Sequence, residues 1–240
     1  MQATGSVRTI ETAIELGVTD ETVRKDFEFL EKRGELIRTH GGASRPERNR
    51  EELPFNERQA VRRMEKQAIA RLAAGRIQAN ETIFLDASST ALTLTEFLPE
   101  VPLTILTNAL NVFHALSDRP NLDLICTGGL FDSRSRSFIG LTAEKALQRY
   151  HIHRMFFSGN GLDLKRGVSE SNSRHAAFKE SVIASAEDVV LLADHSKLAQ
   201  KAAFFFAEVT ELSCLITDKA ADPAFIEQLQ GRGVEVLQGE

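Results

Sequence analysis

The chain contains little cysteine and no long apolar segment, and both absences limit what it can be. Its two cysteines, Cys126 and Cys214, lie far apart in apolar stretches, so we expect two buried thiols in a reducing compartment rather than a disulfide or a metal pair. No stretch approaches the roughly 20 apolar residues that cross a bilayer. The first six residues lack the basic flank and apolar core of a secretory signal. These absences predict a cytoplasmic protein without membrane association.

The overall composition is that of an ordinary globular protein. Of the 240 residues, 42% are hydrophobic and 26% are charged, which argues against intrinsic disorder and fibrous structure. The net charge of −5 argues against a protein that coats nucleic acid along its whole surface. Residues 1–66 carry 13 basic and 13 acidic side chains, so the negative excess lies entirely in the remainder. This distribution is compatible with a small DNA-reading module attached to an acidic body.

The first 42 residues predict two short helices and a strand that enters a tight turn. We expect Thr9 to cap a helix that carries Ile10, Ala13 and Ile14 on one face and ends at Gly17. Thr19 is a good cap for a second helix, on which Val23, Phe27 and Leu30 form one buried stripe. Residues 35–42 then resemble a strand followed by a Gly-Gly turn.

The second helix carries residues suited to DNA. With the apolar stripe facing the core, short hydroxyl and basic side chains remain near its exposed N-terminal end, where a recognition helix needs them to reach base edges. The candidate DNA-binding residues are Thr19, Thr22, Arg24 and Lys25 on this helix and Arg38 and His40 on the following strand and turn. An ordinary capped helix with solvated Arg and Lys explains the helical residues equally well, so helix physics alone leaves both interpretations open.

The rest of the chain alternates between strands and helices after a charged linker with two prolines at 44–54. We therefore divide the chain into residues 1–54, a DNA-binding module with its linker, and residues 55–240, a separate body. A helix at about 56–78 precedes strand-like runs at 82–85, 103–106, 122–126, 155–157, 189–192, 214–216 and 234–237, with helix-like stretches at 90–98, 109–118, 140–150, 174–186 and 223–231. Such alternation predicts an α/β fold with a mostly parallel sheet covered on both faces.

Polar loops follow several of these strands. In open α/β sheets ligands bind outside the carboxyl ends of the strands, and hydroxyls, glycines and a cation there suit a phosphate. The candidate residues are Asp86, Ser88, Ser89 and Thr90 after the first strand, Thr107 and Asn108 after the second, Gly128 and Gly129 after the third, and Lys197 after Asp194, His195 and Ser196. A serine-rich helix cap explains the first loop taken alone. Arg134, Ser135 and Arg136 form either a solvated loop or a lid over an anion.

The N-terminal segment closely resembles the DNA-binding domain of the DeoR/GlpR-type bacterial transcription regulators. Those proteins carry Ser/Thr-x-x-Thr-hydrophobic-Arg-basic-Asp-hydrophobic, found here at residues 19–27, and a wing that matches Arg-Thr-His-Gly-Gly-Ala at 38–43. The resemblance implies a winged helix-turn-helix. The family begins with a further helix upstream of Thr9, and eight residues are too few for it. We therefore expect a module that lacks its first helix.

The body resembles the DeoR-type effector domain, which is itself similar in fold to ribose-5-phosphate isomerase. The family's loops fall on Asp86–Thr90, on Thr107 and Asn108, on the Gly-Gly pair and on Asp194–Lys197, and its later Gly-to-Lys stretch runs from Gly167 through Glu170 to Lys179. The resemblance implies that the hydroxyl loop and Lys197 hold phosphate and that Asp86 and neighbouring groups hold sugar hydroxyls. Glu170 is a further expected effector-binding residue. The pattern is most similar to regulators of deoxy-sugar operons such as fucose.

These observations predict a transcriptional regulator of a carbohydrate catabolic operon. We expect it to be a repressor, because repression is the commoner behaviour in the family that it resembles. Operator DNA and a phosphorylated sugar are the expected partners of a homo-oligomer, a dimer or a tetramer, because symmetric half-sites need at least two readers. We expect no cofactor, no metal and no enzymatic activity. One alternative is a sugar-phosphate isomerase with a vestigial N-terminal segment, for which Asp86, Glu170 and Asp194 are candidate bases. Another is an interaction protein that has lost DNA binding.

Overall fold

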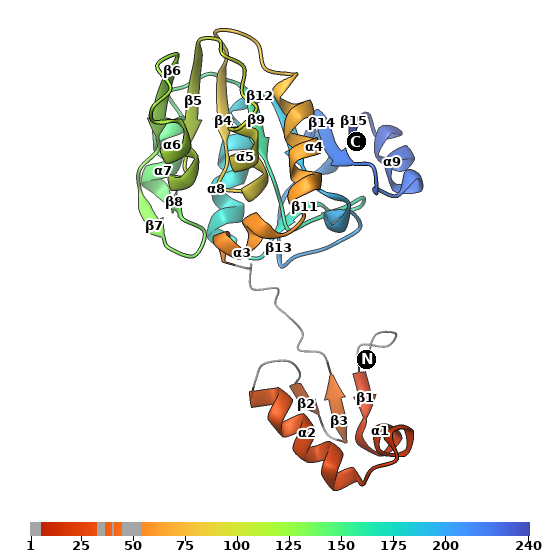
Figure 1. Ribbon diagram of the computed structural model, residues 1–240. Coiled ribbons are helices and arrows are strands. Elements are labelled where there is room, and N and C mark those ends of the chain that lie inside the picture. The colour runs from red at the N-terminus through yellow and green to blue at the C-terminus, as the bar shows by residue number, and fades with distance from the viewer. Residues whose placement is uncertain (1–5, 33–36, 40, 45–53) are drawn as a thin grey trace. The chain divides into compact units, whose positions relative to one another are not determined.

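The chain forms two compact units, Met1–Glu51 and Glu52–Glu240. The computed structural model describes residues 6–32, 37–39, 41–44 and 54–240 (Figure 1). The expected wing residue His40 and nearly all of the expected linker lie outside the described residues. Among the helices that are described, none combines the length and the apolar character needed to cross a membrane.

The N-terminal unit is a helical hairpin with a small antiparallel sheet. In chain order it contains β1 (Ser6–Arg8), α1 (Thr9–Leu16), α2 (Asp20–Lys32), β2 (Ile37–Thr39) and β3 (Gly42–Ser44), with the strands in the order β1-β3-β2. Thr19 caps α2 as expected, because its Oγ1 accepts the Thr22 N–H at 3.2 Å. Thr9 does not cap α1: Arg8 takes that place, and Thr9 is the buried first residue of the helix.

The core of this unit is small. Val23 and Phe27 are buried against Ala13 and Ala43, and Leu30 packs beside them, which confirms the predicted stripe on α2. Of the three apolar residues predicted to share one face of α1, Ala13 is buried, whereas Ile10 is 65% exposed and Ile14 is 77% exposed. The physical reason is that α1 meets the core through its small residue Ala13, and no described element covers the two isoleucines.

The body is built on a parallel sheet, which confirms the predicted fold class. Its strands are β4 (Thr82–Leu85), β5 (Leu103–Thr107), β6 (Leu122–Cys126), β9 (Ile152–Phe157), β12 (Ala186–Leu192), β14 (Cys214–Asp218) and β15 (Glu235–Gly239). Within this described body the seven strands lie in the order β15-β14-β12-β9-β4-β5-β6, and every neighbouring pair is parallel. The chain therefore grows the sheet outwards from β4 in one direction and from β9 in the other.

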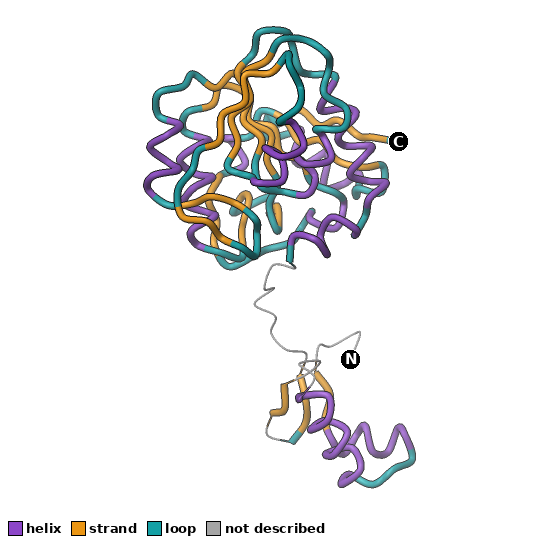
Figure 2. Tube along the Cα trace, turned by 60° about the vertical axis from the view of Figure 1, so that its left-hand side comes forward, coloured by secondary structure: helices purple, strands orange, loops and turns teal. Residues whose placement is uncertain are grey.

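Helices cover both faces of the sheet, because its strands carry buried apolar side chains on both sides. One face packs against α4 (Arg63–Ala74), α5 (Ser89–Leu94) and α6 (Leu110–Leu116), and the other against α7 (Leu141–Leu147), α8 (Ser173–Ile183) and α9 (Pro223–Gln230). Phe156 faces the first group of helices, while its neighbours Met155 and Phe157 face the second. Figure 2 shows the strands running between these helical layers.

The predicted helix at 56–78 is broken. It consists of α3 (Phe55–Ala60) and α4, separated by Val61 in extended backbone and by Arg62 in the left-handed region, at φ 53° and ψ 46°. We call Val61 and Arg62 the elbow. The Lys66 side chain stabilises the break by donating hydrogen bonds to the carbonyl oxygens of Arg58 and Val61, the latter at 2.7 Å. Apolar spacing misled the prediction, since Val61 and Met64 are both exposed.

Two small antiparallel units were not anticipated as such. One is the hairpin of β7 (Leu130–Asp132) and β8 (Ser137–Ile139). The other is a sheet in the order β10-β11-β13, made of β10 (Gly161–Asp163), β11 (Gly167–Glu170) and β13 (Phe204–Ala207). Short 3-10 turns, η1 (His195–Lys197) and η2 (Val209–Glu211), follow β12 and β13. Both cysteines are free thiols, with Cys214 buried and Cys126 partly buried.

Candidate functional site

The candidate site lies where the direction of the sheet topology reverses. The adjacent strands β4 and β9 begin the two opposite halves of the sheet, and such a switch point opens a crevice at the carboxyl ends of the strands. Asp86 follows β4 directly, and Ser158 follows β9. The Ser158 N–H donates to Asp86 Oδ2 at 3.1 Å, so one hydrogen bond joins the two loops across the crevice.

A polar pocket occupies this crevice, and it gathers residues from eight parts of the body. The α3–α4 segment contributes Arg58, Val61, Arg62 and Lys66; the loops after β4, β5, β9 and β12 contribute Asp86, Ala87, Ser88, Ser89, Thr90, Asn108, Ser158, Gly159, Asn160, Asp194, Ser196 and Lys197; β11 and α8 contribute Glu170, His175, Phe178 and Lys179; and Ser135 comes from the β7–β8 hairpin. Five of these side chains are Lys or Arg and three are carboxylates. The lining therefore has a formal excess of two positive charges.

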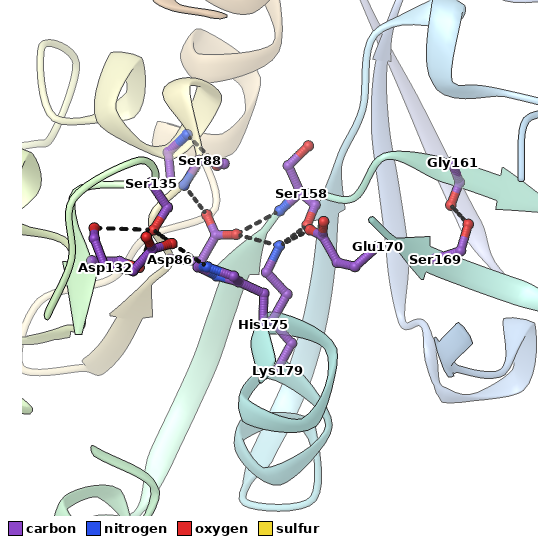
Figure 3. Close-up of polar contacts among 12 residues, drawn as sticks. Asp86, Ser88, Asp132, Ser135, Ser158, Gly161, Ser169, Glu170, His175 and Lys179 are labelled. Atoms are coloured by element: carbon purple, nitrogen blue, oxygen red, sulfur yellow. Dashed lines mark hydrogen bonds and ion pairs between the residues drawn. The ribbon is translucent and has the colours of Figure 1, made fainter. Parts of the chain in front are cut away.

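A buried ion cluster forms the floor of the pocket (Figure 3). Lys179 Nζ lies 3.1 Å from Asp86 Oδ2 and 2.5 Å from Glu170 Oε1, and it also donates to the Ser158 carbonyl oxygen. Asp86 is 1% exposed and Glu170 is 3% exposed, so both charges depend on this partner. Asp86 Oδ1 also accepts the Ser88 N–H at 3.0 Å, which fixes the loop that carries the three hydroxyls.

The hydroxyl loop and Asn108 are buried beside the cluster. Ser88 Oγ caps α5 by accepting the Ala91 N–H at 3.0 Å, and Ser89 and Thr90 form the first turn of that helix. Asn108 donates through Nδ2 to the Phe138 carbonyl oxygen at 2.9 Å, while its Oδ1 has no hydrogen-bond partner among the described residues. A buried amide oxygen of this kind is suited to accept a hydrogen bond from a hydroxyl group.

Lysine and arginine side chains of the α3–α4 segment and of the loop after β12 form another wall of the pocket. The pKa of Lys66 is lowered to about 8, mainly by burial and also by the charges of Lys197 and Arg58, against the opposing effect of Asp194. Arg62 Nε lies 3.2 Å from Asp194 Oδ1 and donates to Ser196 Oγ at 3.0 Å. Mutually repelling cations in a partly buried pocket favour the binding of an anion, because the anion reduces their repulsion.

His175 extends the wall on the side of α7 and α8. It lies one turn before Lys179 on α8, so both side chains point from the same helix face. Its Nε2 lies 3.0 Å from Asp132 Oδ2, which also accepts a hydrogen bond from Ser135 Oγ at 2.6 Å. Burial opposes ionisation of Asp132, but the hydrogen bonds from Ser135 and His175 outweigh it and lower the pKa of this carboxyl.

Most of the effector residues expected from the sequence line this pocket. The structure brings together Asp86, Ser88, Ser89, Thr90, Asn108, Glu170 and Lys197. It places Thr107, Gly128 and Gly129 outside the lining. The Thr107 hydroxyl instead bridges β5 to the Leu85 carbonyl oxygen at 2.7 Å. Gly129, at φ 115°, packs so closely that a Cβ atom would lie 2.9 Å from the Ile139 carbonyl oxygen.

The sequence pattern did not single out several side chains of the pocket. Arg58, Arg62 and Lys66 belong to a segment that was expected to be one continuous helix, and only the elbow shows that they face the site. His175 lies four residues before Lys179, and that spacing could have suggested a shared helix face. Ser158 directly follows β9, so its position at a strand end was the available signal.

The expected DNA-binding residues of α2 lie on its surface. Thr19, Thr22, Arg24 and Lys25 are all exposed, opposite the buried stripe of Val23 and Phe27. The Thr19 and Thr22 hydroxyls lie 2.9 Å apart in the first turn. Arg38 belongs to β2, which pairs with β3 in the expected wing, and His40 lies outside the described residues. This arrangement leaves the N-terminal end of α2 free of cover from the described part of the unit.

Comparison with protein families matches both units. The DeoR-like helix-turn-helix domain matches residues 1–49, and the DeoR C terminal sensor domain matches residues 61–219. The second match covers more than half of the chain and includes the strand ends that form the pocket.

Similar whole chains are bacterial regulators. The HTH-type transcriptional regulator YulB of Bacillus subtilis is 38% identical over 96% of this chain and 90% of its own length. The HTH-type transcriptional repressor GlcR of the same species is 32% identical over 94% and 87%, and the L-fucose operon activator of Haemophilus influenzae is 32% identical over 90% and 87%. Among solved structures, ribose 5-phosphate isomerase from Methanocaldococcus jannaschii matches with a TM-score of 0.42 and 16% identity, over 55% of this chain and 53% of that one.

Proposed function

The chain belongs to the DeoR family of transcriptional regulators, and we propose that a phosphorylated sugar, bound in the pocket of the body, controls its binding to operator DNA of a carbohydrate operon. The proposed regulator represses transcription, since relatives named as repressors include GlcR and the lactose phosphotransferase system repressor of Streptococcus mutans. The L-fucose operon activator makes activation the second possibility to test. The protein would act in the cytoplasm, where operator DNA lies.

The charge of the pocket is the observation that carries this proposal. A phosphate monoester carries between one and two negative charges near neutral pH, which matches the formal excess of two positive charges in the lining. The wall of the pocket carries the cations Lys66 and Lys197, and its floor carries Asp86, Glu170 and Asn108. Cations suit the phosphate, and carboxylate and amide oxygens suit sugar hydroxyls. One pocket therefore offers partners for both halves of a sugar phosphate.

In this proposal the N-terminal unit binds the operator DNA. The exposed Thr19, Thr22, Arg24 and Lys25 would enter the major groove on α2, and the wing strand with Arg38 would meet phosphate or the minor groove. A symmetric operator needs two readers, so the proposed active form is a homo-oligomer, a dimer or a tetramer. The effector then changes operator affinity through a coupling free energy of roughly 1–3 kcal/mol.

Thermal unfolding of the full chain with a panel of hexose, pentose and deoxy-hexose phosphates tests the effector class. Each phosphate is paired with the corresponding free sugar. A bound ligand raises the apparent stability by about 2.7 kcal/mol when its concentration is one hundred times its Kd. We expect at least one sugar phosphate to raise the melting temperature while its free sugar does not, and we expect Lys197→Ala to reduce that rise. Equal effects of phosphates and free sugars would refute the proposed effector class.

The same panel also tests whether the pocket turns its ligand over. We propose sensing without turnover, so the best-stabilising aldose phosphate should not convert to the ketose phosphate when incubated with the protein and followed by NMR. Conversion that is lost in Glu170→Gln would establish the isomerase alternative instead.

A further inference from the structure

The elbow is held in an unfavourable backbone conformation by side chains of the pocket. Arg62 adopts left-handed backbone angles, which are unfavourable for an L-residue because its Cβ then lies too close to the following carbonyl oxygen. The hydrogen bond from Arg62 Nε to Ser196 Oγ and the ion pair with Asp194 hold the residue there. Lys66 holds the same turn by capping the carbonyl oxygens of Arg58 and Val61.

Arg62 is only partly buried, whereas the carboxylate that it contacts is buried. Its side chain is 36% exposed and that of Asp194 is 6% exposed, so the guanidinium group is within reach of the pocket while the carboxylate is buried beneath it. Asp194 Oδ1 also accepts the N–H and the hydroxyl of Ser196, so it retains hydrogen bonds when the arginine leaves. A phosphate oxygen is a good partner for a guanidinium group, which can bind two of its oxygens at once.

We propose that Arg62 is a ligand of the anionic group of the effector, and that it exchanges Asp194 for that anion. This inference rests on the proposed function, because it names a further group that binds the same phosphate. The exchange changes what holds the elbow, and α3, which precedes the elbow, follows the stretch that joins the body to the N-terminal unit along the chain. Occupancy of the pocket thereby alters the segment through which the two units are connected.

The position of α3 supports a response of this whole segment. Phe55 is 2% exposed, and its N–H donates to the Arg134 carbonyl oxygen of the β7–β8 hairpin at 3.2 Å. The guanidinium group of Arg58 lies 5.4 Å from the centre of the Phe55 ring. One end of α3 is thus anchored to the body, and its other end meets the elbow. A change in the backbone at Arg62 therefore moves α3, because no flexible loop separates this helix from the elbow.

The first test compares anion affinity between variants by isothermal titration calorimetry, with inorganic phosphate and with the sugar phosphate that most stabilises the wild type. Arg62→Gly removes the guanidinium group and relieves the backbone strain, and Arg62→Asn is a second variant that tolerates left-handed angles. Arg63→Asn is the matched control, since Arg63 is the exposed next residue and does not line the pocket. We expect both Arg62 variants to raise the Kd roughly 10- to 100-fold, as for a lost charged hydrogen bond, and the control to leave it within twofold.

The Asp194→Asn variant tests whether Arg62 leaves Asp194 for the anion or stays paired with Asp194 as a fixed structural contact. The asparagine amide oxygen can still accept the Ser196 N–H, but without the negative charge it binds Arg62 less strongly. We expect this variant to bind the sugar phosphate several-fold more tightly, and we expect the double variant with Arg62→Gly to bind as weakly as Arg62→Gly alone. A fixed structural contact between Arg62 and Asp194 would give the opposite result, because Asp194→Asn would then weaken binding to the same degree as Arg62→Gly.

Hydrogen exchange of the peptide spanning residues 54–66 tests whether binding in the pocket changes the structure of α3 and the elbow. Addition of the sugar phosphate should change its exchange in the wild type and in Arg63→Asn, but not in Arg62→Gly at matched occupancy. Binding by the wild type with unchanged affinity in both Arg62 variants would overturn this inference and leave the proposed function intact. Failure of every sugar phosphate to bind the wild type would overturn both.

Discussion

Replacement of Lys179 by methionine should destabilise the body strongly, because one ammonium group holds two buried carboxylates. Lys179 Nζ contacts Asp86 at 3.1 Å and Glu170 at 2.5 Å, and all three side chains are at least nine-tenths buried. Removal of one partner from a buried ion pair costs about 3–5 kcal/mol. One kcal/mol shifts the melting temperature of a domain of this size by roughly 2–4 °C, so the body should melt about 6–20 °C lower.

A double variant separates the charge effect from lost packing. Lys179→Met with Glu170→Gln leaves Asp86 as the remaining carboxylate of the cluster, and Asp86 still accepts the N–H groups of Ser88 and Ser158. We therefore expect the double variant to regain part of the lost stability, measured by urea unfolding with a signal from the body. A loss below about 1 kcal/mol in the single variant, within the range of ordinary surface substitutions, would refute this reasoning. So would a double variant that is no more stable than the single one.

Three further predictions concern the two units separately. Because the pKa of Lys66 is about 8 and a bound anion raises it, sugar-phosphate affinity should be constant near pH 7 and fall as the pH rises through 8; calorimetry at several pH values should show no such fall in Lys66→Met. Arg24→Ala should cost roughly 1–3 kcal/mol on an operator duplex selected from a random pool and abolish its preference over a scrambled duplex, whereas Lys25→Ala should weaken both equally in gel shifts at fixed salt. Gly129→Ala should lower stability by about 1–3 kcal/mol because of its backbone angle and close packing, yet leave the Kd for sugar phosphate within twofold.

The sequence was sufficient for the parallel sheet and for part of the pocket lining. The seven strands are continuous apolar runs because both faces of the sheet are covered, and that pattern is visible without a structure. Asp86, Asn108 and Lys197 were identified because each follows a strand at its carboxyl end. The same rule selected Thr107, which instead bonds to the neighbouring strand. A position after a strand therefore predicts nearness to the site but not the direction of the side chain.

Features that depend on a single backbone angle were not predictable. Apolar spacing through Val61 and Met64 favoured one continuous helix, yet both side chains are exposed and the chain breaks at Arg62. The break brings Lys66 back onto the freed carbonyl oxygens and turns Arg62 towards Asp194, and neither contact has a local sequence signal. Helical periodicity placed Ile10 and Ile14 on an apolar face of α1, but it identifies such a face and not what covers it, and both side chains are exposed.

Release of DNA by a sugar phosphate tests the central claim most directly. The full chain is bound to an operator duplex selected from a random pool and titrated, at fixed salt, with the best-stabilising sugar phosphate and with its free sugar. We predict that the phosphate changes the fraction of bound DNA at concentrations where the free sugar has no effect, and that Lys197→Ala binds the duplex normally but responds only at higher phosphate concentration. DNA binding that is indifferent to every sugar phosphate, or equally sensitive to the free sugar, would contradict the account.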